Sequence, residues 1–107
     1  MRISITMNNA EQISLIEGLV KIIRPVTADE VSFKDGLDTN LNETGLDSLD
    51  LIMLSVYLSE LYGVPEEIAK TMSEDTTKTV RDMINFMEMH HTQELPATAA
   101  ECLEKIK

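Results

Sequence analysis

The sequence contains little of what builds disulfides, tight turns or aromatic cores. Its 107 residues include no tryptophan, one cysteine, three prolines and four glycines, and aromatic residues make up 4%. One cysteine excludes an internal disulfide and a cysteine-rich metal site. So few glycines and prolines favour helices over the many turns of a β-sandwich. The core must be aliphatic with methionine as filler, and a reducing compartment is the simplest setting.

Positive charge is also scarce. Nine basic residues stand against 19 acidic ones, which gives a formal net charge of −10. A nucleic-acid binder needs Lys and Arg for its phosphate contacts, so we expect none here, but rather an acidic surface for basic partners. No apolar run approaches the ~20 residues of a membrane span, and the N-terminus lacks the apolar segment of a signal peptide. We expect a cytoplasmic protein.

The length and the apolar content predict one small folded domain. At 107 residues, 43% of them hydrophobic, the chain can bury a modest core. We divide it into an N-terminal extension (1–8), a helical domain (9–91) and a C-terminal tail (92–107), and we expect a monomer. Residues 2–6 alternate apolar and polar, but without a partner strand a loosely docked extension is the better interpretation.

The first predicted helix begins at Asn9. Asparagine is a good N-cap, and Gln12 follows three residues later, as in a capping box. Its apolar residues share one face: Ile13, Ile16, Leu19, Val20 and Ile23. Pro25 ends the helix. The long connection that follows, residues 25–47, should be pinned to the core by Val31, Phe33, Leu37 and Leu41.

A second helix is predicted over residues 48–62. Asp47 or Ser48 caps its start, and Gly63 ends it. A short third helix is expected within residues 66–72.

The last core helix begins after Thr77 or Thr79, either of which can cap it. Its apolar face comprises Val80, Met83, Ile84 and Met87. Residues 97–107 also carry apolar residues at helical spacing, which favours a short tail helix (Ala99, Cys102, Leu103 and Ile106). The predicted fold class is therefore all-α: a four-helix bundle with a long loop between helices one and two, and a short C-terminal helix.

The centre of the chain reads Gly45-Leu46-Asp47-Ser48-Leu49-Asp50. Ser48 lacks the surroundings of a catalytic nucleophile, which needs a base within hydrogen-bonding reach. The only histidines, His90 and His91, end the last core helix, and there is no Gly-x-Ser-x-Gly elbow. From the residues alone, Ser48 is most simply a helix cap. We expect no catalytic residues and no enzyme activity.

This segment resembles the Asp-Ser-Leu motif of acyl carrier proteins, in which the serine carries a 4′-phosphopantetheine arm. Acyl carrier proteins are four-helix domains with a long first loop, and their modified serine begins the second helix. Leu54 and Leu58 stand where the family has core leucines, and Tyr62 stands near its aromatic residue. The resemblance covers roughly residues 10–90.

The resemblance implies a covalent carrier. A phosphopantetheinyl transferase would attach the arm of coenzyme A to Ser48, at a helix N-terminus that favours an anion. The thiol of the arm would hold acyl groups as thioesters for the acyl-loading, acyl-transfer or synthase enzymes of a fatty-acid, polyketide or specialised lipid pathway. Two alternatives stay open: an aminoacyl or peptidyl carrier, and a non-carrier helical interaction module in which Ser48 is only a cap. The acidity moderately favours acyl cargo.

The second helix has two apolar sectors when residues 48–62 are placed at ~100° per residue. One sector belongs to the core: Leu51, Leu54, Leu58 and Leu61. The other lies beside Ser48 and is predicted to dock partners: Leu49, Ile52, Met53 and Val56. The alternative is a helix that is buried on two sides.

Charges for docking would come from Asp47, Asp50 and Glu60. This sequence departs from the family pattern in one respect, because fatty-acid carrier proteins have several glutamates on this helix. Met53 and Ser59 stand where an acid would be expected. This departure favours partners from a dedicated pathway over standard fatty-acid synthase enzymes.

No metal site is expected. Asp38-x-Asn40-x-Asn42 begins like an EF-hand loop, but position six is Glu43 rather than glycine and position twelve is Leu49 rather than glutamate. His90 and His91 point in different directions, because they are adjacent on a helix. Core filler is the expected role of Met83, Met87 and Met89, and Cys102 should pack on the tail helix.

Overall fold

The computed structural model describes residues 8–72, 77–93, 95 and 98–106, and over these residues it contains helices and no strand. The α-helices are α1 (Asn9–Ile23), α2 (Ser48–Tyr62), α3 (Glu66–Ala69), α4 (Val80–His90) and α5 (Ala99–Ile106). This confirms the predicted all-α bundle with a long first loop and a short C-terminal helix. No helix in these ranges is long and apolar enough to cross a membrane.

α1 begins where predicted, but its cap is one residue earlier. Asn8 is extended (φ −72°, ψ 173°), and its side chain accepts a hydrogen bond from the N–H of Glu11 at 2.8 Å. Asn9 is already helical and Gln12 is buried, so the predicted Asn9 cap is wrong. The helix ends before Pro25 as expected. The predictions for residues 2–6 lie outside the described residues.

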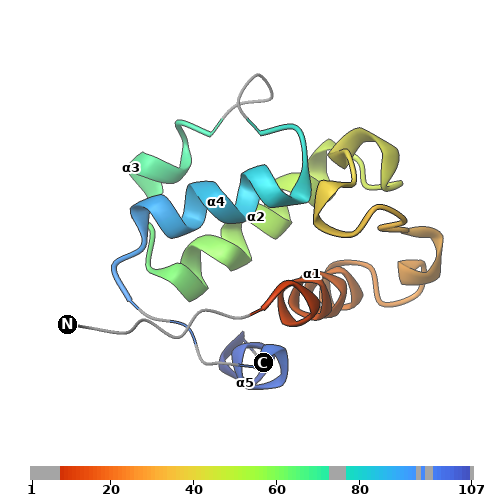
Figure 1. Ribbon diagram of the computed structural model, residues 1–107, viewed down its shortest axis with the longest axis horizontal. Helices are drawn as coiled ribbons and strands as arrows, with labels where there is room; N and C mark the ends of the chain where they lie inside the picture. The colour runs from red at the N-terminus through yellow and green to blue at the C-terminus, as the bar shows by residue number, and fades with distance from the viewer. Residues whose placement is uncertain (1–7, 73–76, 94, 96–97, 107) are drawn as a thin grey trace.

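α2 and α4 lie side by side and run in the same direction, with α1 crossing below them (Figure 1). Their C-terminal ends are joined by the N–H of Thr92, which donates to the carbonyl of Tyr62 at 2.9 Å. Gly63 ends α2 with φ +70°, as predicted. The Gln93 amide then donates to the carbonyls of Glu60 and Leu61, so free carbonyls at this helix end are satisfied.

The core contains most of the predicted faces of α2 and α4, while Leu51 of the predicted α2 face is only partly buried and packs against the core. Leu54, Leu58 and Leu61 of α2 are buried, and so is the whole predicted face of α4. Of the two candidate caps for α4, the structure uses Thr79, which forms a capping box with Asp82. Met89 is exposed, so the prediction of core filler is wrong for that residue. It follows buried Met87 by two positions and therefore points to the opposite side of the helix.

The connection between α1 and α2 is ordered by short 3₁₀ turns and by its own side chains. The turns are η1 (Ala28–Glu30), η2 (Gly36–Asp38) and η3 (Leu41–Glu43). Leu37 and Leu41 are buried, while Val31 and Phe33 pack against the core partly buried, as predicted. The loop is also tied to the start of α4, because the N–H of Leu41 donates to the carbonyl of Lys78 at 2.8 Å.

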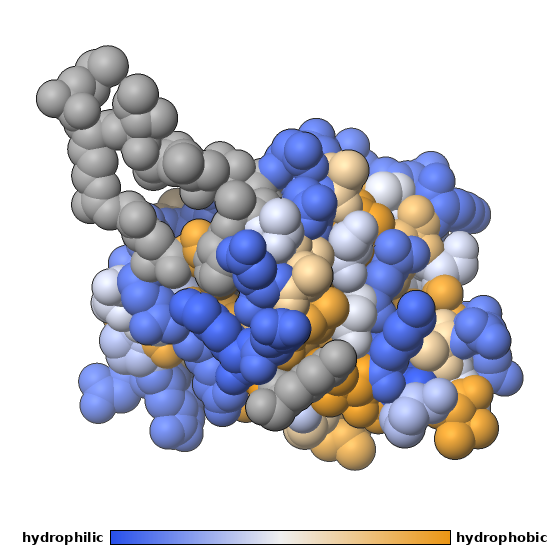
Figure 2. Space-filling model, turned by 90° about the horizontal axis from the view of Figure 1, so that it is seen from below, coloured by the Kyte–Doolittle hydropathy of each residue, from blue (hydrophilic) through white to orange (hydrophobic). Residues whose placement is uncertain are grey.

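α5 packs mainly on α1 and also contacts α2. Gly18 permits the approach, because a Cβ at that position would overlap the side chain of Leu103. Glu11 of α1 accepts a hydrogen bond from the N–H of Ala99 at 2.7 Å, and Cys102 is buried. Polar side chains cover much of the face on which α1 and α5 lie, and apolar side chains show between them and along the lower edge of the view (Figure 2). The domain boundary drawn at residue 91 stays a prediction.

Candidate functional site

Ser48 is the first residue of α2 and its side chain is exposed. The cap is Asp47, whose carboxylate accepts from the N–H of Asp50 at 2.9 Å. Asp50 reciprocates by accepting from the N–H of Asp47 at 3.2 Å, which completes a capping box. The Ser48 hydroxyl takes no part in this arrangement and makes no hydrogen bond within the described part of the chain. The interpretation of Ser48 as the helix cap is therefore wrong.

Two backbone donors beside the Ser48 hydroxyl are also unused. Asp47 occupies the N–H of Asp50 with its side chain and the N–H of Leu51 with its carbonyl. The N–H groups of Ser48 and Leu49 donate to no group among the residues described. Free N–H groups at a helix start carry partial positive charge and attract anions. An anion attached to Ser48 would therefore lie next to unpaired donors.

Arg24, which follows the last residue of α1, holds the segment that precedes Ser48. Its guanidinium donates to the carbonyl of Gly45 at 3.1 Å and lies 3.4 Å from the carboxylate of Asp50. It also donates to the Thr27 hydroxyl at 2.8 Å and lies 3.7 Å from Glu30. The side chains of Arg24 and Asp50 are only 24% and 13% exposed, so solvent screens their pair less than a surface pair.

The turn before Ser48 is held from inside as well. The Thr44 hydroxyl donates to the carbonyl of Leu41 at 2.8 Å and accepts from the N–H of Leu46 at 3.2 Å. Thr44 and Leu46 are both buried. Gly45 has φ +96°, a backbone conformation that other residues adopt only with strain. Ser48 therefore follows a turn whose conformation is fixed by these hydrogen bonds.

The second apolar sector of α2 is exposed. The exposed fractions are 66% for Leu49, 58% for Ile52, 37% for Met53 and 45% for Val56. The alternative of a helix buried on two sides is therefore wrong, and α5 does not cover this face.

The acids assigned to docking lie in different settings. Asp47 and Glu60 are exposed, whereas Asp50 is engaged by Arg24. Ser59 is buried and donates to the sulfur of Met87 at 3.7 Å, so an acid at that position would lie in the core. Of the two positions where the family pattern leads us to expect an acid, only Met53 is therefore on the exposed surface.

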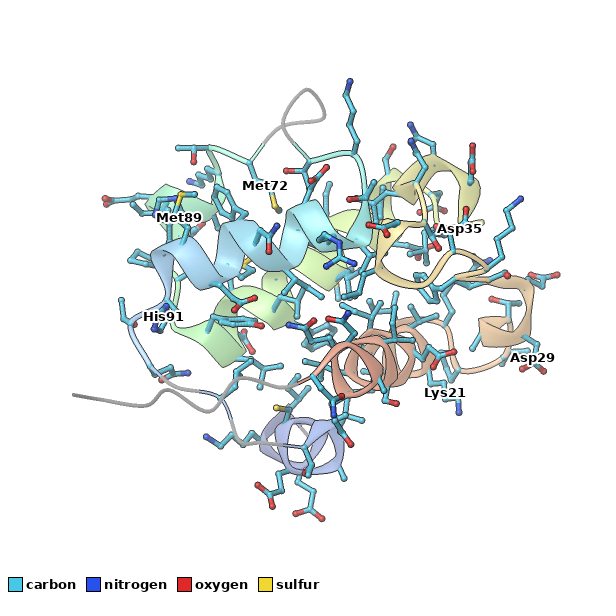
Figure 3. All side chains as sticks on the ribbon, viewed as in Figure 1. Lys21, Asp29, Asp35, Met72, Met89 and His91 are labelled. Carbon is cyan, nitrogen blue, oxygen red and sulfur yellow. The ribbon has the colours of Figure 1, made fainter. Side chains whose placement is uncertain are left out.

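A pocket of about 460 Å³ lies beside Ser48, which contributes to its lining. Its walls come from α2, from α3 and the residues after it, and from the start of α4. Most of its lining residues are apolar: Leu41, Leu51, Ile52, Val56, Ala69, Met72 and Met83. Met72 points from the segment after α3 toward α4 (Figure 3). The volume falls within the range of small-molecule pockets, ~300–1,000 Å³.

Within the described residues, neither histidine lies where it could serve Ser48 as a base. His90 and His91 lie at the C-terminal end of α4, which adjoins the C-terminal end of α2. His91 is labelled there in Figure 3. Ser48 lies at the other end of α2, ~20 Å away at 1.5 Å per residue. The described residues also contain no group of three side chains that could hold a metal ion.

Sequence reasoning missed three parts of the site. It did not find Arg24, the buried Thr44, or the pocket wall formed by α3. Arg24 carries no local signal, because its partner Asp50 is 26 positions away. Thr44 looked like an ordinary loop residue among other polar ones.

The fold and the site together define a helical domain with an exposed serine at the first position of its second helix. The family model described as phosphopantetheine attachment site matches residues 17–87, which is more than half of the chain and includes the whole of α2. The chain belongs to this family, whose members carry covalently attached 4′-phosphopantetheine. Comparisons with curated proteins and with solved structures found no match.

Replacing Arg24 tests whether its contacts with Gly45 and Asp50 hold the turn that precedes Ser48. Arg24→Gln should lower the free energy of unfolding by about 1.5 kcal/mol, because hydrogen bonds to a charged, half-buried group are lost. Amide exchange should quicken at residues 44–47. Urea denaturation and hydrogen exchange measure both effects. The control is Lys21→Gln, an exposed lysine in the last turn of the same helix (Figure 3), which should change stability by no more than ~0.5 kcal/mol. Equal effects of the two variants would contradict the claim that Arg24 holds the turn before Ser48.

Proposed function

We propose that this chain is an acyl carrier protein whose 4′-phosphopantetheine arm is attached to Ser48. The observation that carries the proposal is the exposed Ser48 hydroxyl, free of hydrogen bonds in the described structure, at the first position of α2. It lies within the matched range and beside an apolar pocket. A serine that another enzyme must reach needs this exposure, whereas a serine that caps a helix does not.

The surroundings of Ser48 suit a phosphodiester. In the transferase reaction the Ser48 oxygen forms a bond to the β-phosphorus of coenzyme A, the pyrophosphate bond breaks, adenosine 3′,5′-bisphosphate leaves, and the serine proton passes to a base of the transferase. The free N–H groups of Ser48 and Leu49 favour the resulting anion. Arg24 offsets the negative charge of Asp50, which would otherwise repel it.

The chain itself supplies no acid or base to this chemistry. When attached, the arm provides a thiol that holds the cargo as a thioester. The residues around Ser48 fix the position of the attachment point and form the surface that partner enzymes bind. The chain is thus a carrier and not an enzyme.

The pocket favours acyl over aminoacyl cargo. Its leucine, isoleucine, valine and methionine side chains suit a hydrocarbon chain, which gains free energy when it leaves water. A charged amino group in the same place would lose its hydration. The pathway we infer is one of fatty-acid, polyketide or specialised lipid synthesis.

The partner surface we propose is the apolar face of α2: Leu49, Ile52, Met53 and Val56. Asp47 and Glu60 add exposed negative charge beside it, and Asp50 adds a charge that Arg24 balances. A transferase and acyl-loading, acyl-transfer or synthase enzymes would pack against this face. Its apolar character favours dedicated partners over enzymes that recognise a glutamate-rich helix. We place the carrier in the cytoplasm as a monomer.

Ser48→Ala tests the attachment. Incubation with coenzyme A and a broad-specificity phosphopantetheinyl transferase should add the mass of one arm to the wild type and nothing to the variant, as measured by intact-protein mass spectrometry. Ser55→Ala, on the same helix, should still be modified. The stability of Ser48→Ala should stay within ~0.5 kcal/mol of wild type, because Asp47 caps the helix. An unmodified wild type, or an arm on the Ser48→Ala chain, would overturn the proposal.

Leu49→Ala tests the docking face. Leu49 is 66% exposed, so its loss should leave the thermal midpoint nearly unchanged. It should lower kcat/KM of the transferase at least about fivefold, the effect of a contact worth ~1 kcal/mol. Steady-state kinetics with Glu17→Ala, an exposed residue of α1, provides the control. Unchanged kcat/KM for Leu49→Ala would remove this residue from the docking face.

A further inference from the structure

Arg24 uses each nitrogen of its guanidinium on a different part of the long loop. Its Nε donates to the Thr27 hydroxyl at 2.8 Å, and its Nη2 lies 3.7 Å from the carboxylate of Glu30. Its Nη1 donates to the carbonyl of Gly45 at 3.1 Å and lies 3.4 Å from the carboxylate of Asp50. This one side chain therefore joins the beginning of the loop to its end and to the first turn of α2.

The backbone of Arg24 is itself fixed to α1. Its N–H donates to the carbonyl of Val20 at 2.7 Å, and Val20 is buried in the core. The core thus holds Arg24, and Arg24 holds the turn before Ser48. Lysine could not replace it, because a lysine carries its donors on one nitrogen, whereas the planar guanidinium spreads them over a rigid fork.

The contacts of Arg24 reach both sides of Ser48. Gly45 lies three residues before Ser48, and Asp50 lies two residues after it. Asp50 also accepts a hydrogen bond at 3.2 Å from the N–H of Asp47, the residue directly before the serine. The Ser48 hydroxyl is exposed and makes no hydrogen bond within the described part of the chain. The backbone around Ser48 therefore sets its position, and Arg24 fixes that backbone from the end of α1.

Resting on the proposed attachment of the arm to Ser48, we propose that Arg24 is a positioning residue for this reaction and sets how fast the arm is transferred once the transferase is bound. In this step the Ser48 oxygen bonds to the β-phosphorus of coenzyme A, the pyrophosphate bond breaks, adenosine 3′,5′-bisphosphate leaves, and the serine proton passes to a base of the transferase. The attacking and leaving oxygens must lie roughly in line. A misplacement of ~1 Å can cost ~100-fold in rate, so a loosened turn should slow the step.

Arg24 should affect the rate of transfer more than the binding of the transferase. It belongs to the end of α1 and not to the apolar face of α2, which is the proposed partner surface. That face stays intact when Arg24 is replaced. A separation of rate from affinity therefore distinguishes positioning of the serine from a contact with the enzyme.

Single-turnover transfer of the arm tests the proposal. Wild type and Arg24→Gln are mixed with coenzyme A and an excess of a broad-specificity phosphopantetheinyl transferase at several concentrations, and the added mass is followed by intact-protein mass spectrometry. In Arg24→Gln the rate at saturating transferase should fall roughly tenfold, while the transferase concentration that gives half of this rate should stay within about twofold of wild type. Arg24→Lys should be nearly as slow, because charge alone does not restore the separate contacts.

Arg81→Gln is the matched control. Arg81 also ties the long loop to a helix, through the carboxylate of Asp38 at 2.8 Å, but this pair joins η2 to α4. Its loss removes the same charge and should leave the saturating rate within about twofold of wild type, because the turn before Ser48 is untouched. Circular dichroism at the assay temperature verifies that each variant is folded.

Thr27→Val is a milder variant that keeps the test decisive if Arg24→Gln does not fold. It removes the partner of the guanidinium Nε and keeps the side-chain shape, so the saturating rate should fall roughly threefold. The inference is overturned by an unchanged saturating rate in the folded Arg24 or Thr27 variants, by an equal fall in Arg81→Gln, or by full recovery in Arg24→Lys. Each of these results leaves the attachment to Ser48 standing, whereas a wild type that accepts no arm contradicts the proposed function itself.

Discussion

The reciprocal hydrogen bonds between Asp47 and Asp50 fix the first turn of α2, and the rest of the site depends on them. Because Asp47 satisfies the helix start, the Ser48 hydroxyl and two backbone N–H groups remain free. Arg24 secures Asp50 and the Gly45 carbonyl from the end of α1. The loop therefore holds Ser48 in a fixed position while its side chain stays exposed.

α2 serves two purposes on opposite sides. Its buried leucines pack against the other helices, and its exposed apolar residues continue the surface around Ser48. Such a patch on a small acidic domain favours recognition by packing, with charge supplying steering. The pocket begins on the same helix, so the proposed attachment point, the proposed partner surface and the pocket are all positioned by α2.

The fold was largely predictable from the sequence because its signals are local. Helical spacing located the buried faces of α2 and α4, and Gly63 marked the end of α2. The exposed sector of α2 was separated from the core sector correctly. Which of two neighbouring residues caps a helix was harder to predict. Asn8 caps α1 instead of Asn9, and Asp47 caps α2 although both Asp47 and Ser48 were candidates. Arg24 acts through contacts with residues that are distant in sequence, which periodicity does not encode.

The central claim is that Ser48 carries the arm. Intact-protein mass spectrometry of the protein isolated from its own cells, followed by fragmentation, tests it most directly. The account predicts a population heavier by one phosphopantetheine, alone or with an acyl group, and fragments that place the added mass on Ser48. A chain that is unmodified throughout, or that carries the arm on another residue, would contradict the account.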